Sequence, residues 1–230
     1  MTKRVMKAMY RFLFTTCAMA IAVGAHAQSA GTRMVKVGAN QIAPQVTSGD
    51  LSAPSVAGSK VDIAADTEPI VSLAYMYTDQ FSVEAFAGLP YVHDIRGDGA
   101  MADVGRIGQV KQVSPTVFAQ YRANAPTAPF RPYVGLGLTL AHFYGLEGSG
   151  TLTAVTNPGG EPTKLSLDSR TKLALSTQLG ASFRTNQRWF FDVAVIKTFI
   201  SNTARLSTGQ AVKLKLDPLS VGLSMGYEFP

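Results

Sequence analysis

The chain of 230 residues is poor in cysteine, in charge and in long apolar runs. Its single cysteine, Cys17, lies near the start, so the remainder can form no disulfide and no cysteine-ligated metal site. Charged residues make up only 16% of the chain, below the roughly 25% of soluble domains, and 21 glycines and 12 prolines accompany them. This composition argues against a helical bundle, a coiled coil or a disordered chain.

The net charge of +6 derives mainly from the first 27 residues, which hold four basic residues and no acid: Lys3, Arg4, Lys7 and Arg11. Without them, 17 basic residues face 15 acidic ones, a net charge of +2. We therefore expect no nucleic-acid partner.

The same 27 residues are predicted to be a secretory signal peptide. A basic stretch, 1–11, precedes an apolar run, 12–25, and the triplet Ala25-His26-Ala27 predicts cleavage before Gln28. The run of 14 residues is shorter than the roughly 20 of a membrane-spanning helix, although an N-terminal anchor helix is the alternative. No later apolar run approaches 18 residues. Residues 28–230 are thus expected to be an exported β domain, either soluble or a barrel in the outer membrane.

The C-terminal segment shows the clearest alternation with a period of two. Apolar residues occupy the odd positions and small or polar residues the even ones: Leu219, Val221, Leu223, Met225, Tyr227 and Phe229 against Ser220, Gly222, Ser224, Gly226 and Glu228. Such alternation predicts a strand with one apolar face. A barrel wall accounts for it, because lipid favours large apolar side chains and a narrow lumen favours small or polar ones.

Similar segments recur along the chain and predict eight strands: 33–42, 70–77, 81–89, 113–122, 132–144, 172–183, 189–200 and 219–229. Short links (78–80, 124–129 and 184–188) alternate with long ones (44–66, 91–110, 145–170 and 201–209), as in barrels with short periplasmic turns and long outer loops. Glu84, Arg122 and Asp192 fall on the lumen side of this pattern. A strand break is expected near Asp217-Pro218.

The alternation does not show which face of each strand points out of the barrel, since in a soluble lipocalin-like barrel the apolar face points inward. Glycine and serine on the polar face suit a crowded interior and favour the membrane form. Aromatic residues near the short links and the C-terminus predict an interfacial girdle: Tyr77, Phe81, Tyr121, Phe130, Tyr133, Phe183, Trp189, Phe190, Tyr227 and Phe229.

Five segments, in this order and among these strands, resemble the OmpW family of outer-membrane proteins: 35–39 (VKVGA), 77–84 (YTDQFSVE), 89–95 (LPYVHDI), 130–137 (FRPYVGLG) and 216–218 (LDP). The resemblance covers essentially all of 28–230. It implies an all-β fold, an eight-stranded antiparallel up-and-down transmembrane β-barrel in the outer membrane of a Gram-negative cell. One departure is that Pro230 follows Phe229, whereas such barrels commonly end in an aromatic residue, which bears on recognition by the barrel assembly machinery.

The resemblance also implies passage of small hydrophobic molecules through a narrow, rather apolar lumen, without a cofactor, and a lateral opening in the wall. Parity places Met76, Phe86, Phe118 and Phe143 in the lumen, where they either line a passage or simply fill the interior. Pro90 either leaves a gap in the wall or ends a strand. The alternative function is a plugged structural barrel that presents extracellular loops for surface interaction.

No catalytic or metal constellation is found. His93 and His142 are too few and too far apart for a metal site, and His142 has no nucleophile beside it. The protein is therefore not expected to be an enzyme. The long links carry charges of both signs, which indicates solvation, while Arg96, Arg106 and Arg170 could bridge to lipopolysaccharide phosphates. Outer-membrane lipid is the other expected partner.

Overall fold

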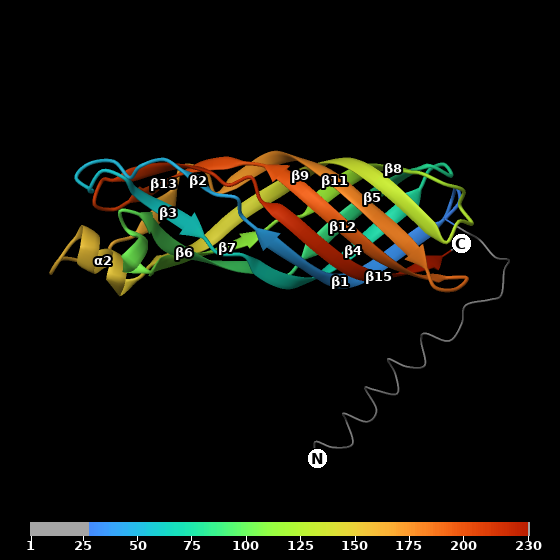
Figure 1. Cartoon of the computed structure of the whole chain (residues 1–230), viewed down its shortest axis with the longest axis horizontal. Helices are drawn as coiled ribbons and strands as arrows, with labels where there is room; N and C mark the ends of the chain where they lie inside the picture. The colour runs from blue at the N-terminus through green and yellow to red at the C-terminus, as the bar shows by residue number, and fades with distance from the viewer. Residues whose placement is uncertain (1–27, 230) are drawn as a thin grey trace, which may run out of the picture.

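A computed structural model describes residues 28–229, so the predicted signal peptide, 1–27, lies outside the described residues. Eight strands form a closed antiparallel barrel in which sequence neighbours pair and the last strand pairs with the first (Figure 1). They are β1 (Arg33–Ala43), β4 (Asp66–Met76), β5 (Phe81–Gly88), β8 (Thr116–Arg122), β9 (Phe130–Gly148), β11 (Thr171–Arg184), β12 (Trp189–Phe199) and β15 (Leu219–Phe229). The predicted fold class and the number of barrel strands are confirmed.

Within residues 28–229, no helix is long and apolar enough to cross a membrane.

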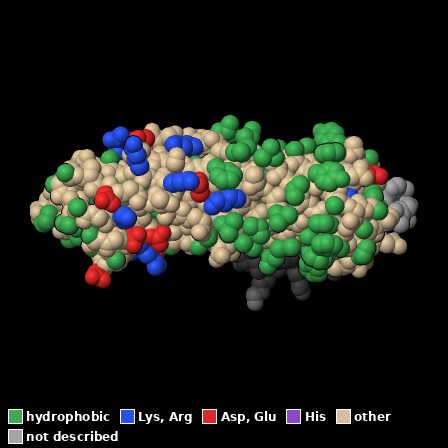
Figure 2. Space-filling model, turned by 45° about the horizontal axis from the view of Figure 1, so that its top comes forward, with side chains coloured by type: hydrophobic (Ala, Val, Ile, Leu, Met, Phe, Trp, Pro, Cys, Tyr) green, Lys and Arg blue, Asp and Glu red, His purple; other side chains and the backbone are tan. Residues whose placement is uncertain are grey.

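The apolar face of each barrel strand lies outside. Leu223 is 63% exposed and Leu138 53%, whereas Glu84 and Arg122, on the opposite parity, are at most 1% exposed. On the face drawn in Figure 2, apolar side chains gather over one half of the long molecule, and most of the visible Lys, Arg, Asp and Glu side chains lie over the other half. The predicted orientation is therefore confirmed, and the apolar half forms a belt suited to lipid.

The long links are not simple loops, as the sequence suggested, but fold into an extension of the barrel. Strands β3 (Ser59–Ile63), β6 (Tyr91–Gly99) and β7 (Arg106–Val113) prolong the wall beyond β9, with a 3-10 turn, η1 (Ala102–Val104), between β6 and β7. A second sheet contains β10 (Leu165–Leu167), β13 (Ser201–Leu206), β14 (Ala211–Lys215) and β2 (Thr47–Ser48), and a short helix, α2 (Gly150–Thr156), caps the end. The extension lies opposite the end with the short turns, which is the periplasmic end in barrels of this type.

The predicted aromatic girdle is confirmed only for residues at positions whose side chains point out of the barrel. Tyr77, Phe81 and Trp189 are exposed near the short turns, and Trp189 packs edge-on against Tyr227 with ring centroids 4.9 Å apart. Tyr133 and Phe190, in contrast, are buried inside the barrel. Both follow residues whose side chains point outward. Because successive side chains of a strand point to opposite faces, these two point into the barrel although they lie near the membrane interface.

Close packing inside the narrow barrel requires glycine at several lumen positions. A Cβ atom on Gly226 would lie 2.1 Å from Phe190 Cζ, whereas on Gly222 of the same strand the nearest atom would be Asn40 Oδ1 at 3.3 Å. We expect Gly226→Ala to lower the free energy of unfolding by about 1–3 kcal/mol, because Phe190 has no room to move. Urea unfolding in lipid vesicles, followed by Trp189 fluorescence, measures this. Gly222→Ala is the matched control; equal effects of the two variants would contradict the explanation.

Candidate solute passage

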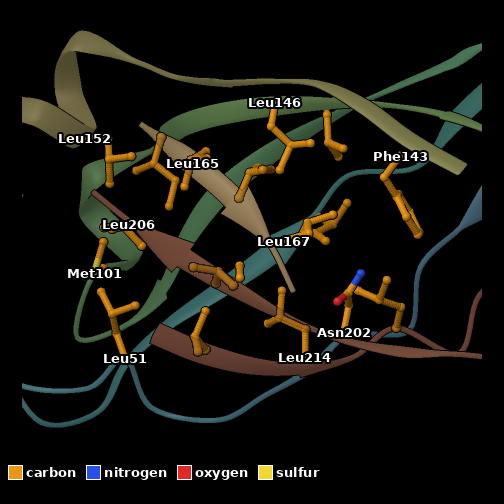
Figure 3. A pocket seen from close by; sticks show the side chains of 18 residues that line it. Leu51, Met101, Phe143, Leu146, Leu152, Leu165, Leu167, Asn202, Leu206 and Leu214 are labelled. Carbon is orange, nitrogen blue, oxygen red and sulfur yellow. The ribbon is translucent and has the colours of Figure 1, made fainter. Parts of the chain in front are cut away.

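The extension encloses an apolar cavity, the outer chamber. Its volume is about 60 Å³, and its lining comes from all the folded links: Leu51, Val61, Ile107, Leu152, Leu206 and Leu214 are among the contributors (Figure 3). The strands alternate here as well, because Val212 and Leu214 of β14 are buried while Lys213 and Lys215 are exposed. Asn202 is the only polar residue among the lining side chains. The outer chamber can therefore accommodate apolar groups but offers them almost no hydrogen bonds.

A second cavity, the inner chamber, lies next to it at the mouth of the barrel. Its volume is about 50 Å³, and both chambers share four lining residues: Ile63, Val110, Phe143 and Leu216. One wall carries hydroxyl groups that follow one another across four strands. Thr116 Oγ1 lies 2.8 Å from Thr139 Oγ1, Thr139 Oγ1 lies 2.7 Å from Ser176 Oγ, and Ser176 Oγ lies 2.8 Å from Thr198 Oγ1. The passage thus becomes more polar as it enters the barrel.

Below the inner chamber the lumen is closed by five buried side chains, the charged plug: Lys36, Glu84, Arg122, Tyr133 and Asp192. Lys36 Nζ lies 2.8 Å from Glu84 Oε1 and 3.0 Å from Asp192 Oδ1, and the Tyr133 hydroxyl donates to Asp192 Oδ1 at 2.8 Å. The Arg122 guanidinium carbon lies 4.5 Å from the centroid of the Tyr133 ring. The cavity directly above the plug has a volume of only about 10 Å³, room for a single water at most.

The periplasmic end is also filled. Arg131 donates to the backbone oxygens of Gln28 at 2.7 Å and Asp79 at 2.5 Å, and Arg184 pairs with Glu228 at 3.3 Å. An apolar cluster of Met34, Ala74, Met76 and Phe190 packs nearby. None of these residues lines the outer chamber, the inner chamber or the small cavity above the plug.

The four predicted lumen residues lie at different depths. Phe143 lines both chambers, and Phe86 lines the inner chamber and the small cavity above the plug. Phe118 and Met76 are fully buried and line none of these cavities. Sequence reasoning missed Lys36 and Tyr133 of the plug, although both stand on lumen parity beside outward Val37 and Val134.

Pro90 separates β5 from β6 at an interruption of the wall. The β5–β8 ladder ends at the pair Phe86 and Thr116, and the β6–β7 ladder begins at Tyr91 and Gln112. Within the described part of the chain, no backbone hydrogen bond joins residues 87–90 to residues 113–115. Pro115 faces this stretch and, like Pro90, has no N–H to donate. We call these two segments the wall gap.

The histidines stand apart from each other. His93 is buried and its Nδ1 lies 2.8 Å from the Ala64 carbonyl oxygen, whereas His142 is on the outer wall with Nδ1 2.8 Å from Thr171 Oγ1. Over residues 28–229, no three His, Cys, Asp or Glu side chains are grouped so as to hold a metal ion.

On the surface of the extension, charges of opposite sign pair with one another. Arg106 Nε lies 2.7 Å from Asp94 Oδ1, and Arg205 Nε lies 2.5 Å from Asp168 Oδ1. The hydrogen bond from Arg205 lowers the pKa of the Asp168 carboxyl group. Arg96 and Arg170 are exposed. Arg106 is therefore engaged within the protein, while Arg96 and Arg170 are accessible from outside.

Comparison with known proteins agrees with this architecture. The sequence profile of the OmpW family matches residues 29–229. Outer membrane protein W of Vibrio cholerae is 31% identical over 175 residues, which are 74% of this chain and 77% of the relative. Outer membrane protein AlkL of Ectopseudomonas oleovorans is 25% identical, over 74% of this chain and 69% of the relative.

The crystal structure of the outer membrane protein OprG from Pseudomonas aeruginosa superposes with a TM-score of 0.75 and 26% identity, covering 87% of this chain and 97% of that one. The barrel with its apolar belt, the family match and these relatives agree on location in the Gram-negative outer membrane. The chain belongs to the OmpW family of outer-membrane proteins.

Proposed function

We propose that the protein passes small hydrophobic molecules into the outer membrane, without a cofactor and without catalysis. A solute enters the outer chamber, moves into the inner chamber past Phe143 and Phe86, and leaves sideways through the wall gap into the bilayer. The observation that carries this proposal is an apolar chamber outside the membrane that adjoins a lumen closed below by buried charges.

The plug makes a straight path to the periplasm unfavourable. An apolar solute at this depth would have to displace Lys36 from both of its carboxylates and leave those charges buried without a partner. Breaking a buried ion pair in this way costs about 3–5 kcal/mol. The wall gap, with two prolines and no backbone hydrogen bonds between its segments, opposes a sideways exit far less.

The second candidate function is a plugged scaffold that presents its extension for surface interaction. The complete burial of Arg122 and Phe118 and the ion-paired plug below the inner chamber favour it. In this alternative the chambers are packing defects of the extension and carry no solute.

Three partners follow from the same surfaces. The belt of exposed apolar side chains contacts membrane lipid, and Arg96 and Arg170 contact lipopolysaccharide phosphates. The barrel assembly machinery recognises the final strand, β15, whose Phe229 is exposed and is followed by Pro230.

Uptake of radiolabelled decane by cells that express the protein tests the proposal. We expect Val110→Trp, at the junction of the two chambers, to reduce uptake above the empty-vector level by about tenfold, since the larger ring fills the passage. Val117→Trp, on the lipid face of β8, should leave uptake unchanged.

In planar bilayers the wild type should show no steady ion conductance, because the plug closes the lumen.

If wild-type cells take up no more decane than empty-vector cells, the transport proposal is wrong and the scaffold function stands. If Val110→Trp and the wild type take up decane equally well, solutes do not use the chambers.

A further inference from the structure

Two residues that line the inner chamber each carry a buried hydrogen-bond acceptor that has no partner in the described part of the chain. The first is Nε2 of His93, a residue that is 1% exposed. The other ring nitrogen, Nδ1, lies 2.8 Å from the carbonyl oxygen of Ala64. Because a carbonyl oxygen only accepts, Nδ1 carries the hydrogen. In the neutral ring Nε2 then offers a lone pair, and the buried side chain has no carboxylate bonded to it that would stabilise a second proton.

The second acceptor is Oδ1 of Asn40, which is also 1% exposed. Its amide nitrogen, Nδ2, donates to the Tyr91 hydroxyl at 3.0 Å. The Tyr91 ring in turn stacks parallel to the His93 ring, with centroids 6.1 Å apart and planes 8° apart. Tyr91 thus holds both side chains in place, one from β1 and one from β6.

Asn40 and His93 line the inner chamber together. Buried polar atoms are nearly always hydrogen-bonded, and leaving an acceptor unpaired is unfavourable. Two residues of one lining that each carry an unpaired acceptor therefore fit a ligand that supplies a donor. Thr116 donates to the Ser114 carbonyl oxygen at 3.1 Å, so Thr139, Ser176 and Thr198 each donate to the hydroxyl before them. On this part of the lining the hydroxyl oxygens therefore offer lone pairs, and they too fit a ligand that donates.

The charges below the inner chamber restrict the kind of polar group. Lys36 is already bound by Glu84 and Asp192, and Arg122 donates to Ser82, Ser182 and Gln120. The two cations and two carboxylates of the plug carry no net charge, so the plug offers no net positive charge to balance a further carboxylate. An ionised fatty acid would also bring its oxygens against acceptor atoms. A neutral hydroxyl group both donates and accepts and carries no charge.

We propose that the inner chamber is a head-group subsite for neutral, hydroxyl-bearing amphiphiles such as long-chain alcohols, whose apolar chain extends into the outer chamber. The inference rests on the proposed function, because it names the solutes that the same passage prefers. The hydroxyl group donates to His93 Nε2 or Asn40 Oδ1, and the alkyl chain contacts the leucine-rich lining beyond Phe143.

Nitrogen-15 NMR of histidine side chains in lipid nanodiscs tests the subsite directly. We expect 1-decanol to shift the Nε2 resonance of His93 in the direction of an accepted hydrogen bond, and decane and ionised decanoate to leave it unshifted. His142, on the outer wall, is the internal control. Equal shifts with decane and decanol would overturn the proposal, and so would no shift with decanol at concentrations that saturate uptake, since water alone would then occupy the subsite.

Cell uptake separates this inference from the proposed function. Wild-type cells should take up 1-decanol about tenfold faster than decane, after subtraction of the empty-vector rates, because only the alcohol satisfies the acceptors. His93→Phe keeps the stacking ring but removes the acceptor, and it should lower the ratio of decanol uptake to decane uptake from about ten to about one. His142→Phe should change neither rate.

If decane and decanol enter at equal rates and His93→Phe changes neither, the subsite is absent although transport is real. If neither compound enters faster than in empty-vector cells, the proposed function itself fails.

Discussion

A disulfide across the wall gap is expected to abolish most decane uptake. In the double variant Leu89→Cys, Val113→Cys, one thiol stands on each segment of the gap and both lie on the outward face, and the mature chain predicted by the sequence has no other cysteine. Oxidation should lower uptake by about tenfold, because the two segments can no longer separate to release the solute. A reducing agent should restore uptake in the same sample, so that folding and expression are held constant.

The control is a second cross-link within the intact ladder of the same two strands. Phe81 and Tyr121 are paired in register on β5 and β8, and Phe81→Cys, Tyr121→Cys should take up decane at the same rate when oxidised and when reduced. Full uptake by the oxidised gap variant, with the disulfide verified by mass spectrometry, would show that solutes do not leave through the wall gap.

Removal of the plug lysine should have the largest effect on stability. We expect Lys36→Met to lower the free energy of unfolding by about 3–5 kcal/mol, because Glu84 and Asp192 would then be buried without their shared cation. Urea unfolding in lipid vesicles measures the change. Adding Glu84→Gln and Asp192→Asn to the same chain should recover part of it, since neither position then holds a charge that has lost Lys36, while Arg122 keeps its hydrogen bonds to Ser82, Ser182 and Gln120.

Lys213→Met is the matched control, because Lys213 is exposed on β14, and its effect should stay within about 0.5 kcal/mol. If Lys36→Met costs no more than Lys213→Met, the plug is not the ion-paired unit described above.

The barrel was predictable because its strands obey one simple rule. Large apolar residues alternate with small or polar ones over ten or so positions, as in β11 and β15, and that pattern specifies each strand and its two faces. The same alternation in β12 specifies the lumen position of Asp192. The break at Asp217, where φ is positive at 29°, agrees with the predicted end of the alternation before Pro218.

The extension could not be predicted in the same way. Its strands are as short as two or three residues in β2 and β10, too few for a period to be recognised. They are stabilised by pairing with distant segments, as when Leu214 of β14 pairs with Ser48 of β2. Charges of mixed sign on the outer surface of these strands made the links resemble solvated loops.

The candidate passage was predictable only in part. Parity shows that Phe86, Phe118 and Phe143 share the inner face, but the cavities distinguish them by depth, with Phe143 at the junction of the chambers and Phe118 packed away from them. Depth depends on the stagger between strands, which a single sequence does not encode in its alternation. The unpaired atoms of Asn40 and His93 became visible only once β1 and β6 were placed around one cavity.

The position of the outer chamber determines where an apolar molecule would first be bound. It lies in the folded extension, beyond the apolar half of the molecule in Figure 2. An apolar compound arriving from outside would therefore leave water inside the extension before it reaches the acyl chains, so that its desolvation and its entry into the membrane would be separate steps.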